Sequence, residues 1–160
     1  MAVSLLLISD THVPKRARDL PAPVWDAVAR ADVVIHAGDW VDAALFDELD
    51  RRATRLVACW GNNDGPDLRA RLPERADVTL AGVRFTVVHE TGAAAGRDAR
   101  MSRRYPDTDV LVFGHSHIPS IFTLEPDGIR VEAVRSARAK LKLEPGRKYL
   151  INPGSVGQPR

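Results

Sequence analysis

Cysteine is nearly absent from this 160-residue chain, and apolar runs of membrane-spanning length are missing. The single cysteine, Cys59, cannot form an internal disulfide, so nothing in the sequence calls for an oxidising compartment. A membrane-spanning helix needs about 20 consecutive apolar residues, and residues 1–5 lack the basic region that begins a signal peptide. We therefore expect a cytoplasmic protein that does not contact a membrane.

Internal repeats, linkers and low-complexity segments are also lacking. A chain of this length buries a hydrophobic core without help from disulfides. We therefore predict one domain that spans residues 1–160.

The net charge is small, at +2, but it is distributed unevenly. Residues 128–160 contain eight lysines and arginines against two glutamates, which leaves a negative balance for residues 1–127. A basic segment is typical of proteins that bind nucleic acid, so a nuclease is one alternative function. Because aromatic residues do not alternate with the basic ones, a solvated surface is the preferred interpretation.

Continuous apolar runs predict three buried strands in the first part of the chain, at 5–8, 33–36 and 56–60. Helices are expected between them, at 21–30, where two prolines mark the start, and at 42–52. An order of strand, helix, strand, helix, strand indicates right-handed crossovers and a parallel sheet.

The rest of the chain indicates more strands, two hairpins and two helices. A short helix is expected at 66–71, and a turn leading into a basic helix at 92–104. The turns of the hairpins are marked by Ala81-Gly82 and Pro126-Asp127-Gly128. The expected strands are 78–80, 85–88, 110–113, 121–123, 129–133, the alternating segment 137–143, and 149–151.

Polar side chains that bind metals follow five of the apolar runs, at the point where each run ends. They are Asp10 and His12, Asp39, Asn62, His89, and His115 with His117. In open α/β sheets, ligands bind beyond the carboxyl ends of the strands. Oxygen and imidazole donors without thiolate suit Mn²⁺, Fe, Zn²⁺ or Ni²⁺. Seven donors exceed the needs of one ion, so the sequence predicts a dinuclear centre with a bridging carboxylate.

Each of these motifs alone is weak evidence, because Asp-x-His and Gly-Asp are common by chance. His36, Asp32 and Asp47 are similar residues to which we assign no chemistry. From the residues alone, it also stays open whether His115 and His117 share one ion or bind two.

The ordered motifs resemble those of the calcineurin-like metallophosphoesterases. The residues that carry the resemblance are Asp10-Thr11-His12, Gly38-Asp39, Gly61-Asn62-Asn63-Asp64, His89 and Gly114-His115-Ser116-His117. The closing segment 152–156, Asn-Pro-Gly-Ser-Val, resembles the small bacterial and archaeal phosphodiesterase branch, to which the retromer scaffold subunit is related.

The resemblance implies an α/β fold in which two mixed β-sheets pack as a sandwich flanked by helices. It also implies how the ligands divide between the two ions. One ion takes Asp10, His12 and His117, and the other takes Asn62, His89 and His115, with Asp39 as the bridge. Asp39, Asn62, Asn63 and Asp64 are the implied catalytic residues.

The predicted function is a dinuclear phosphoesterase, specifically a phosphodiesterase, with Mn²⁺ as the first choice of metal and a small phosphoester as substrate. Metal-activated hydroxide attacks phosphorus in line, while the ions and Asn62 stabilise charge on the phosphoryl oxygens. The alternatives are a metal-binding interaction scaffold with weak catalysis, and a nuclease or nucleotide hydrolase. The oligomeric state, including a homodimer, stays open.

Three features depart from the family pattern. Asn63 stands where many members have a histidine, and an amide cannot donate a proton to a leaving group. We therefore expect a bias toward substrates with good leaving groups. Glu90 replaces a common glycine and either orients His89 or faces solvent. Family members usually continue into one more strand after the segment 152–156, so we expect the domain to lack its last strand.

Other residues have weaker predicted roles near the site. Arg16, Arg18 and Arg97 are candidates for docking the substrate phosphate, although loop arginines are usually only solvated. Asn152 and Ser155 either shape the rim of the cleft or simply form a turn, and the turn is the preferred interpretation.

Overall fold

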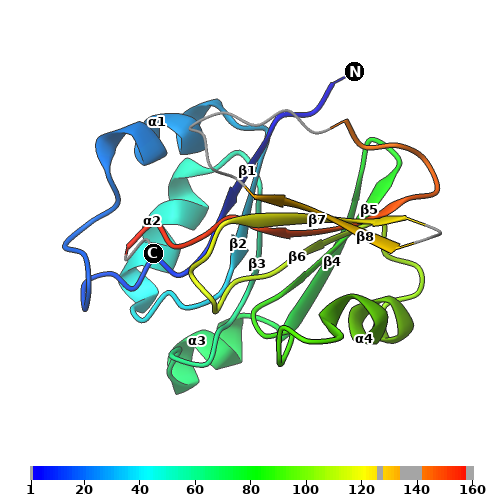
Figure 1. Cartoon of the computed structure of the whole chain (residues 1–160). Helices are drawn as coiled ribbons and strands as arrows, with labels where there is room; N and C mark the ends of the chain where they lie inside the picture. The colour runs from blue at the N-terminus through cyan, green and yellow to red at the C-terminus, as the bar shows by residue number, and fades with distance from the viewer. Residues whose placement is uncertain (1, 126–127, 134–141, 158–160) are drawn as a thin grey trace.

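A parallel three-stranded sheet forms from the first third of the chain (Figure 1). Its strands β1 (Leu5–Ile8), β2 (Val33–Ala37) and β3 (Leu56–Cys59) lie in sequence order. Helices α1 (Ala22–Arg30) and α2 (Ala43–Arg52) supply the crossovers. All five residues of β2 are buried, which explains its continuous apolar pattern. The predicted strands and helices of this region are confirmed.

Among the residues that the structure describes, the second sheet has six strands in the order β4-β5-β6-β9-β7-β8. Strands β5, β6 and β9 are parallel to one another, and the other pairings are antiparallel. β9, the last strand of the chain, therefore lies in the middle of the sheet. The strands are β4 (Arg75–Leu80), β5 (Val83–Val88), β6 (Val110–Val112), β7 (Ser120–Glu125), β8 (Gly128–Ala133) and β9 (Lys148–Asn152).

The two sheets pack face to face, with helices on the outer sides. α1 and α2 cover the three-stranded sheet through residues such as Val28 and Leu49, while α4 (Arg97–Arg104) covers the six-stranded sheet through Met101. Between the sheets, Ile35 and Val87 belong to one cluster of packed, buried apolar residues. α3 (Pro66–Arg71) connects β3 to β4, and the predicted sandwich flanked by helices is confirmed (Figure 1).

The computed structural model describes residues 2–125, 128–133 and 142–157. The resemblance implied two mixed sheets, but the first sheet is entirely parallel, as the order of its strands and helices predicted, and only the second is mixed. Two helical crossovers impose this parallel order. The predicted strand 137–143 lies mostly outside the described residues, and its described part, Lys142 and Leu143, is not in a strand. Among the helices of the described ranges, none is long and apolar enough to cross a membrane.

Asp32 links the N-terminal segment to the start of β2, and this link makes stability depend on pH. Its Oδ2 accepts hydrogen bonds from the Ser4 amide at 2.8 Å and the Ser4 hydroxyl at 2.7 Å. These bonds lower the pKa of Asp32 in the folded protein. Their stabilisation is present above the unfolded-state pKa of about 3.9 and is lost as pH falls through the lower folded pKa.

We expect Asp32→Asn to lower the thermal midpoint at neutral pH and to differ less and less from the parent as the pH falls below about 4. Thermal melts across this range check the expectation. Asp26→Asn is the matched control, because Asp26 is exposed and has no hydrogen-bond or ion-pair partner in the described part of the chain. If the thermal midpoints of Asp32→Asn and the parent differ by the same amount at every pH, the expectation is contradicted.

Candidate metal centre

Seven side chains from both sheets meet where five strands end. The parallel strands β1, β2 and β3 deliver their carboxyl ends to one edge, and the parallel pair β5 and β6 delivers its loops to the same place. The residues are Asp10 and His12 after β1, Asp39 after β2, Asn62 after β3, His89 after β5, and His115 and His117 after β6. Every predicted metal ligand is thus brought into one cluster.

The backbone at this cluster is unusual. Five of the seven residues have positive φ: Asp10 at 51°, His12 at 49°, Asp39 at 62°, His115 at 70° and His117 at 60°. The left-handed region is uncommon for residues other than glycine, although Asp and His enter it more readily than most. Such conformations cost on the order of 1 kcal/mol each and persist where the surrounding structure enforces them. The strain is therefore concentrated at the predicted ligands.

Three residues form a first group of facing ligand atoms. His12 Nε2 lies 3.2 Å from His117 Nε2, and His117 Nε2 lies 3.3 Å from Asp10 Oδ1. All three side chains are buried. Two imidazole nitrogens and a carboxylate oxygen that face one another must share protons or a metal ion between them.

A second group surrounds the amide of Asn62. Asn62 Oδ1 lies 2.9 Å from His89 Nε2 and 3.0 Å from His115 Nδ1. His89 Nδ1 lies 2.7 Å from the carbonyl oxygen of Ala37. A carbonyl only accepts, so His89 Nδ1 carries the proton, and the Nε2 of a neutral ring is left with a lone pair that faces oxygen. A proton or a metal ion is needed at that position.

Asp39 lies between the two groups. Its Oδ2 is 3.5 Å from His12 Nε2, and its Oδ1 is 3.4 Å from His89 Nε2. Burial disfavours the charged form of Asp39, but His89 and hydrogen bonds from Asn63 outweigh it and hold the pKa of Asp39 well below its usual range. Burial likewise opposes the charging of His89, yet Asp39 raises the pKa of that imidazole. A buried carboxylate of this kind can face two cations at once.

The loop Gly61–Asp64 holds Asp39 from one side. The buried Asp64 carboxylate accepts from the backbone amides of Val41 at 2.7 Å, Gly61 at 2.6 Å and Asp39 at 3.1 Å, and burial raises the pKa of Asp64. Asn63 donates to both oxygens of Asp39, through its amide N–H at 2.9 Å and its Nδ2 at 2.6 Å. Asn63 and Asp64 are thus placed against Asp39, and their part in a reaction stays a prediction.

His36, to which we assigned no chemistry, lies next to the cluster and supports it. Its Nδ1 accepts from the Gly38 amide at 3.2 Å, so Nε2 carries the proton and donates to Thr11 Oγ1 at 3.1 Å. Thr11 Oγ1 donates onward to the Asp39 carbonyl at 3.4 Å. Burial lowers the pKa of His36 far below its usual range, and its ring stacks on Trp40 at 3.5 Å. A lone histidine inside a strand gives no signal in the sequence for this role.

The loop after β9 closes the cluster from the other side. Asn152 Nδ2 donates to the Gly114 carbonyl at 2.9 Å, and Ser155 Oγ donates to the Asp10 carbonyl at 2.7 Å. Asn152 Oδ1 also accepts from the Gly154 amide at 2.8 Å, which is the turn that we preferred. This turn therefore fixes the backbone of two loops that carry predicted ligands.

The residues with weaker predicted roles, Glu90 and the three arginines, do not all lie at the cluster. Glu90 is exposed and makes no described hydrogen bond to His89, whose ring is oriented by Ala37 instead. Arg97 lies with its guanidinium 4.9 Å from the centre of the Phe113 ring. Arg16 and Arg18 are exposed in the loop after β1. Phosphate docking by these arginines stays a prediction.

The donor set fits divalent metal ions. The ligand atoms of Asp10, His12 and His117 lie within 4.8 Å of one another, as do those of Asp10, Asp39 and His89. All donors are oxygen or imidazole nitrogen, which suits Mn²⁺, Fe, Zn²⁺ or Ni²⁺. The hydrogen bond from His89 to Ala37 is the kind of contact that orients a ligating histidine.

Comparison with known proteins identifies the family of this chain. The sequence model of the calcineurin-like phosphoesterase superfamily domain matches residues 3–160. A probable metallophosphoesterase of Methanocaldococcus jannaschii is 35% identical over 116 residues, which cover 72% of this chain and 59% of the relative. One of Methanothermobacter thermautotrophicus is 32% identical over 158 residues, 96% of this chain and 77% of the relative.

The fold is also that of a solved structure. Vps29 of Chaetomium thermophilum superposes with a TM-score of 0.73 at 22% identity, over 98% of this chain and 75% of that one. This likeness supports the fold, whereas the sequence matches carry the family. The chain therefore belongs to the calcineurin-like phosphoesterase superfamily.

Proposed function

We propose that this protein is a dinuclear metal-dependent phosphodiesterase. The observation that carries the proposal is the position of Asp39, whose two carboxylate oxygens face different groups of ligand atoms. Asp10, His12 and His117 would hold one ion, and Asn62, His89 and His115 the other. When bound, two divalent ions supply an activated hydroxide at neutral pH and neutralise charge on a phosphoryl group.

The chain's own residues position these groups. Hydrogen bonding to Ala37 fixes the ring of His89 with its Nε2 toward Asn62 and Asp39. Asn62 Nδ2, which makes no hydrogen bond among the described residues, is free to donate to a phosphoryl oxygen. Asn63 donates to Asp39 and has no proton to release, so the leaving group must depart without a proton from this residue. We therefore propose a preference for substrates with good leaving groups.

Metal analysis combined with a hydrolysis assay tests the proposal. We expect purified protein loaded with Mn²⁺ to hold two ions per chain and to hydrolyse bis-p-nitrophenyl phosphate. Activity is expected to disappear with a chelator and to return with Mn²⁺, and Fe, Zn²⁺ and Ni²⁺ are compared in the same assay. Protein that binds metal but hydrolyses no phosphodiester would overturn the enzymatic proposal.

His115→Ala and His117→Ala test how the two histidines divide between the ions. His117 lies in the group with Asp10, and His115 lies in the group with Asn62. Each variant is expected to fall from two ions toward one, because the ligands of the other ion are intact. Metal content per folded chain is measured, with circular dichroism as the check on folding. Loss of both ions from either folded variant would show that the division is wrong.

A catalytically weak interaction scaffold is the second candidate. It is favoured by the amide of Asn63, which cannot act as a general acid, and by a fold shared with Vps29. A scaffold would bind metal with no turnover, so the hydrolysis assay separates the two candidates. The nuclease alternative depends on a basic segment whose residues 134–141 and 158–160 lie outside the described residues.

A further inference from the structure

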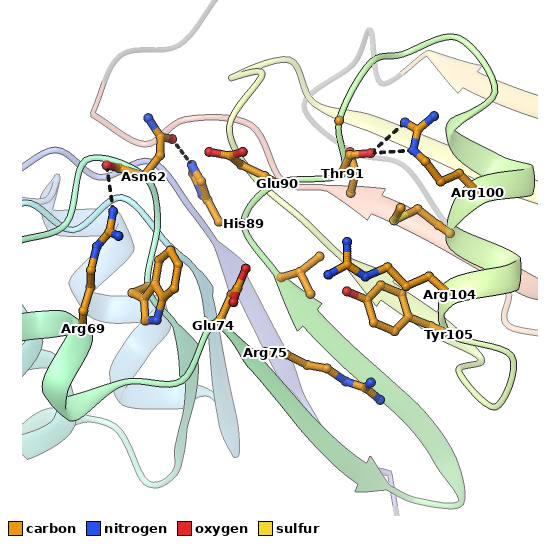
Figure 2. Close-up of a pocket in the computed structure, with 14 residues that line it drawn as sticks. Asn62, Arg69, Glu74, Arg75, His89, Glu90, Thr91, Arg100, Arg104 and Tyr105 are labelled. Carbon is orange, nitrogen blue, oxygen red and sulfur yellow. Dashed lines mark hydrogen bonds between the residues drawn. The ribbon is translucent and has the colours of Figure 1, made fainter.

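A cavity of about 770 Å³ opens directly beside the candidate metal centre (Figure 2). Asn62 and His89 belong both to the second ligand group and to the wall of this cavity, which extends from them to α4. Tyr105, at the end of α4, forms part of the far wall. The volume lies within the range of about 300–1,000 Å³ that is typical of small-molecule sites. A substituent of a bound phosphoester can therefore extend into this cavity.

Three of the four arginines that line the cavity are engaged in holding its walls. Arg69 donates to the carbonyls of Asp64 at 2.7 Å and Asn62 at 3.1 Å. Arg100 donates to the Thr91 carbonyl at 2.7 Å (Figure 2). The third, Arg75, pairs with Asp77 at 2.7 Å. These arginines keep their positive charge, but their N–H donors are directed to partners within the protein and are less available to a ligand.

Three charged side chains on the cavity wall have no hydrogen-bond or ion-pair partner among the described residues: Glu74, Glu90 and Arg104. Figure 2 shows the Glu90 carboxylate close to Asn62 and His89, and the Arg104 guanidinium extending into the cavity from α4. The only described contact of Arg104 is with the ring of Tyr105, at 5.5 Å from its centre.

These free charges have both signs and come from different segments of the wall. Glu90 follows the predicted ligand His89 in the chain, Glu74 directly precedes β4, and Arg104 ends α4. A purely anionic ligand would pair with Arg104 but approach two carboxylates, and a purely cationic one would do the reverse. All three side chains are exposed, and electrostatic complementarity favours a ligand that presents an opposite charge to each of them. A zwitterion meets that condition.

We propose that this cavity binds a zwitterionic substituent of the phosphodiester, with an ammonium group toward Glu90 and Glu74 and a carboxylate on Arg104. The proposal rests on the proposed phosphodiesterase function and specifies its substrate class. The substrate is then a phosphodiester in which one alcohol is the side-chain hydroxyl of an amino acid. The planar guanidinium of Arg104 suits two parallel hydrogen bonds to a carboxylate.

Three synthetic diesters with the same leaving group test the proposal: the 4-nitrophenyl phosphodiesters of ethanol, 2-aminoethanol and L-serine. They differ only by one ammonium group and then one carboxylate. We expect kcat/KM to rise from the ethanol ester to the serine ester, by about fivefold for each charge, the size of a partly screened ion pair. Arg104→Gln is expected to remove the preference for the serine ester over the aminoethanol ester. Glu74→Gln is expected to reduce the preference for both amines over ethanol.

Arg103→Gln is the matched control, because Arg103 is the exposed neighbour on α4 and does not line the cavity. Calorimetric binding of O-phospho-L-serine and O-phosphoethanolamine to chelator-treated protein gives a readout without turnover. If the esters are hydrolysed at equal rates and Arg104→Gln changes nothing, the cavity proposal is overturned while the enzymatic one stands. If none is hydrolysed, the enzymatic proposal fails. In that case a calorimetric preference for phosphoserine that is lost in Arg104→Gln supports the cavity proposal, and equal binding overturns it.

Discussion

Replacing Asp39 by asparagine is expected to abolish dinuclear metal binding and to lower phosphodiester hydrolysis by more than about 100-fold. Replacing a contact that only orients a ligand already costs about 10- to 100-fold in affinity or activity, and Asp39 lies between both ligand groups. Asparagine has the same shape, but one of its two terminal atoms is an amide nitrogen that cannot bind a cation.

The substitution also breaks the hydrogen bonds around this residue. Asn63 donates to Oδ1 through its backbone amide and to Oδ2 through its side chain. Whichever way the new amide is turned, its NH₂ group faces one of these donors. We therefore expect a lower thermal midpoint as well as a loss of metal, since an unmade buried hydrogen bond costs about 1–3 kcal/mol.

Metal content, hydrolysis of bis-p-nitrophenyl phosphate and thermal melts of Asp39→Asn are measured together. Asp42→Asn is the matched control, because Asp42 caps α2 by accepting from the Ala44 amide at 2.9 Å. Asparagine serves that position as well as aspartate does, so this control is expected to keep its metal and its activity. An Asp39→Asn protein with two ions and parental rates would refute the bridging role.

Adding a single methyl group at Gly61 is expected to have the next largest effect. A Cβ at this position would lie 2.3 Å from both the backbone nitrogen and Oδ1 of Asp39. Real Cβ atoms do not approach so closely, and Asp39 cannot move away freely because Asn63 and Asp64 hold its carboxylate and its amide. Overpacking of this kind costs about 1–3 kcal/mol, and a displacement of about 1 Å at a reacting centre costs about 100-fold in rate.

Gly65→Ala is the matched control, only four residues further on. A Cβ there meets no atom within 4 Å, and the backbone φ of −76° is open to any residue. We expect Gly61→Ala to lose hydrolysis and one or both ions while Gly65→Ala keeps both. This expectation is tested by measuring the metal content and the melting temperature of the two variants. Parental activity in Gly61→Ala would mean that the position of Asp39 is less restricted than its contacts indicate.

Much of the secondary structure follows from local sequence patterns. The continuous run Leu5–Ile8 and the fully buried β2 were predicted because apolar residues covered on both faces leave no alternation. Prolines mark the start of α1, and Asp42 marks the start of α2. The place of β9 between β6 and β7 could not be predicted, because strand pairing depends on contacts that are distant in the chain.

The sequence by itself determined which donor side chains are available and that each follows an apolar run, because both are local properties. Only the tertiary structure decided which oxygen of Asp39 faces which group, and that Asn63 and Asp64 contact Asp39. It also placed His36 against Thr11 and opened the cavity between Asn62 and α4. These relations join segments that are far apart in the chain, and they exist only once both sheets have packed.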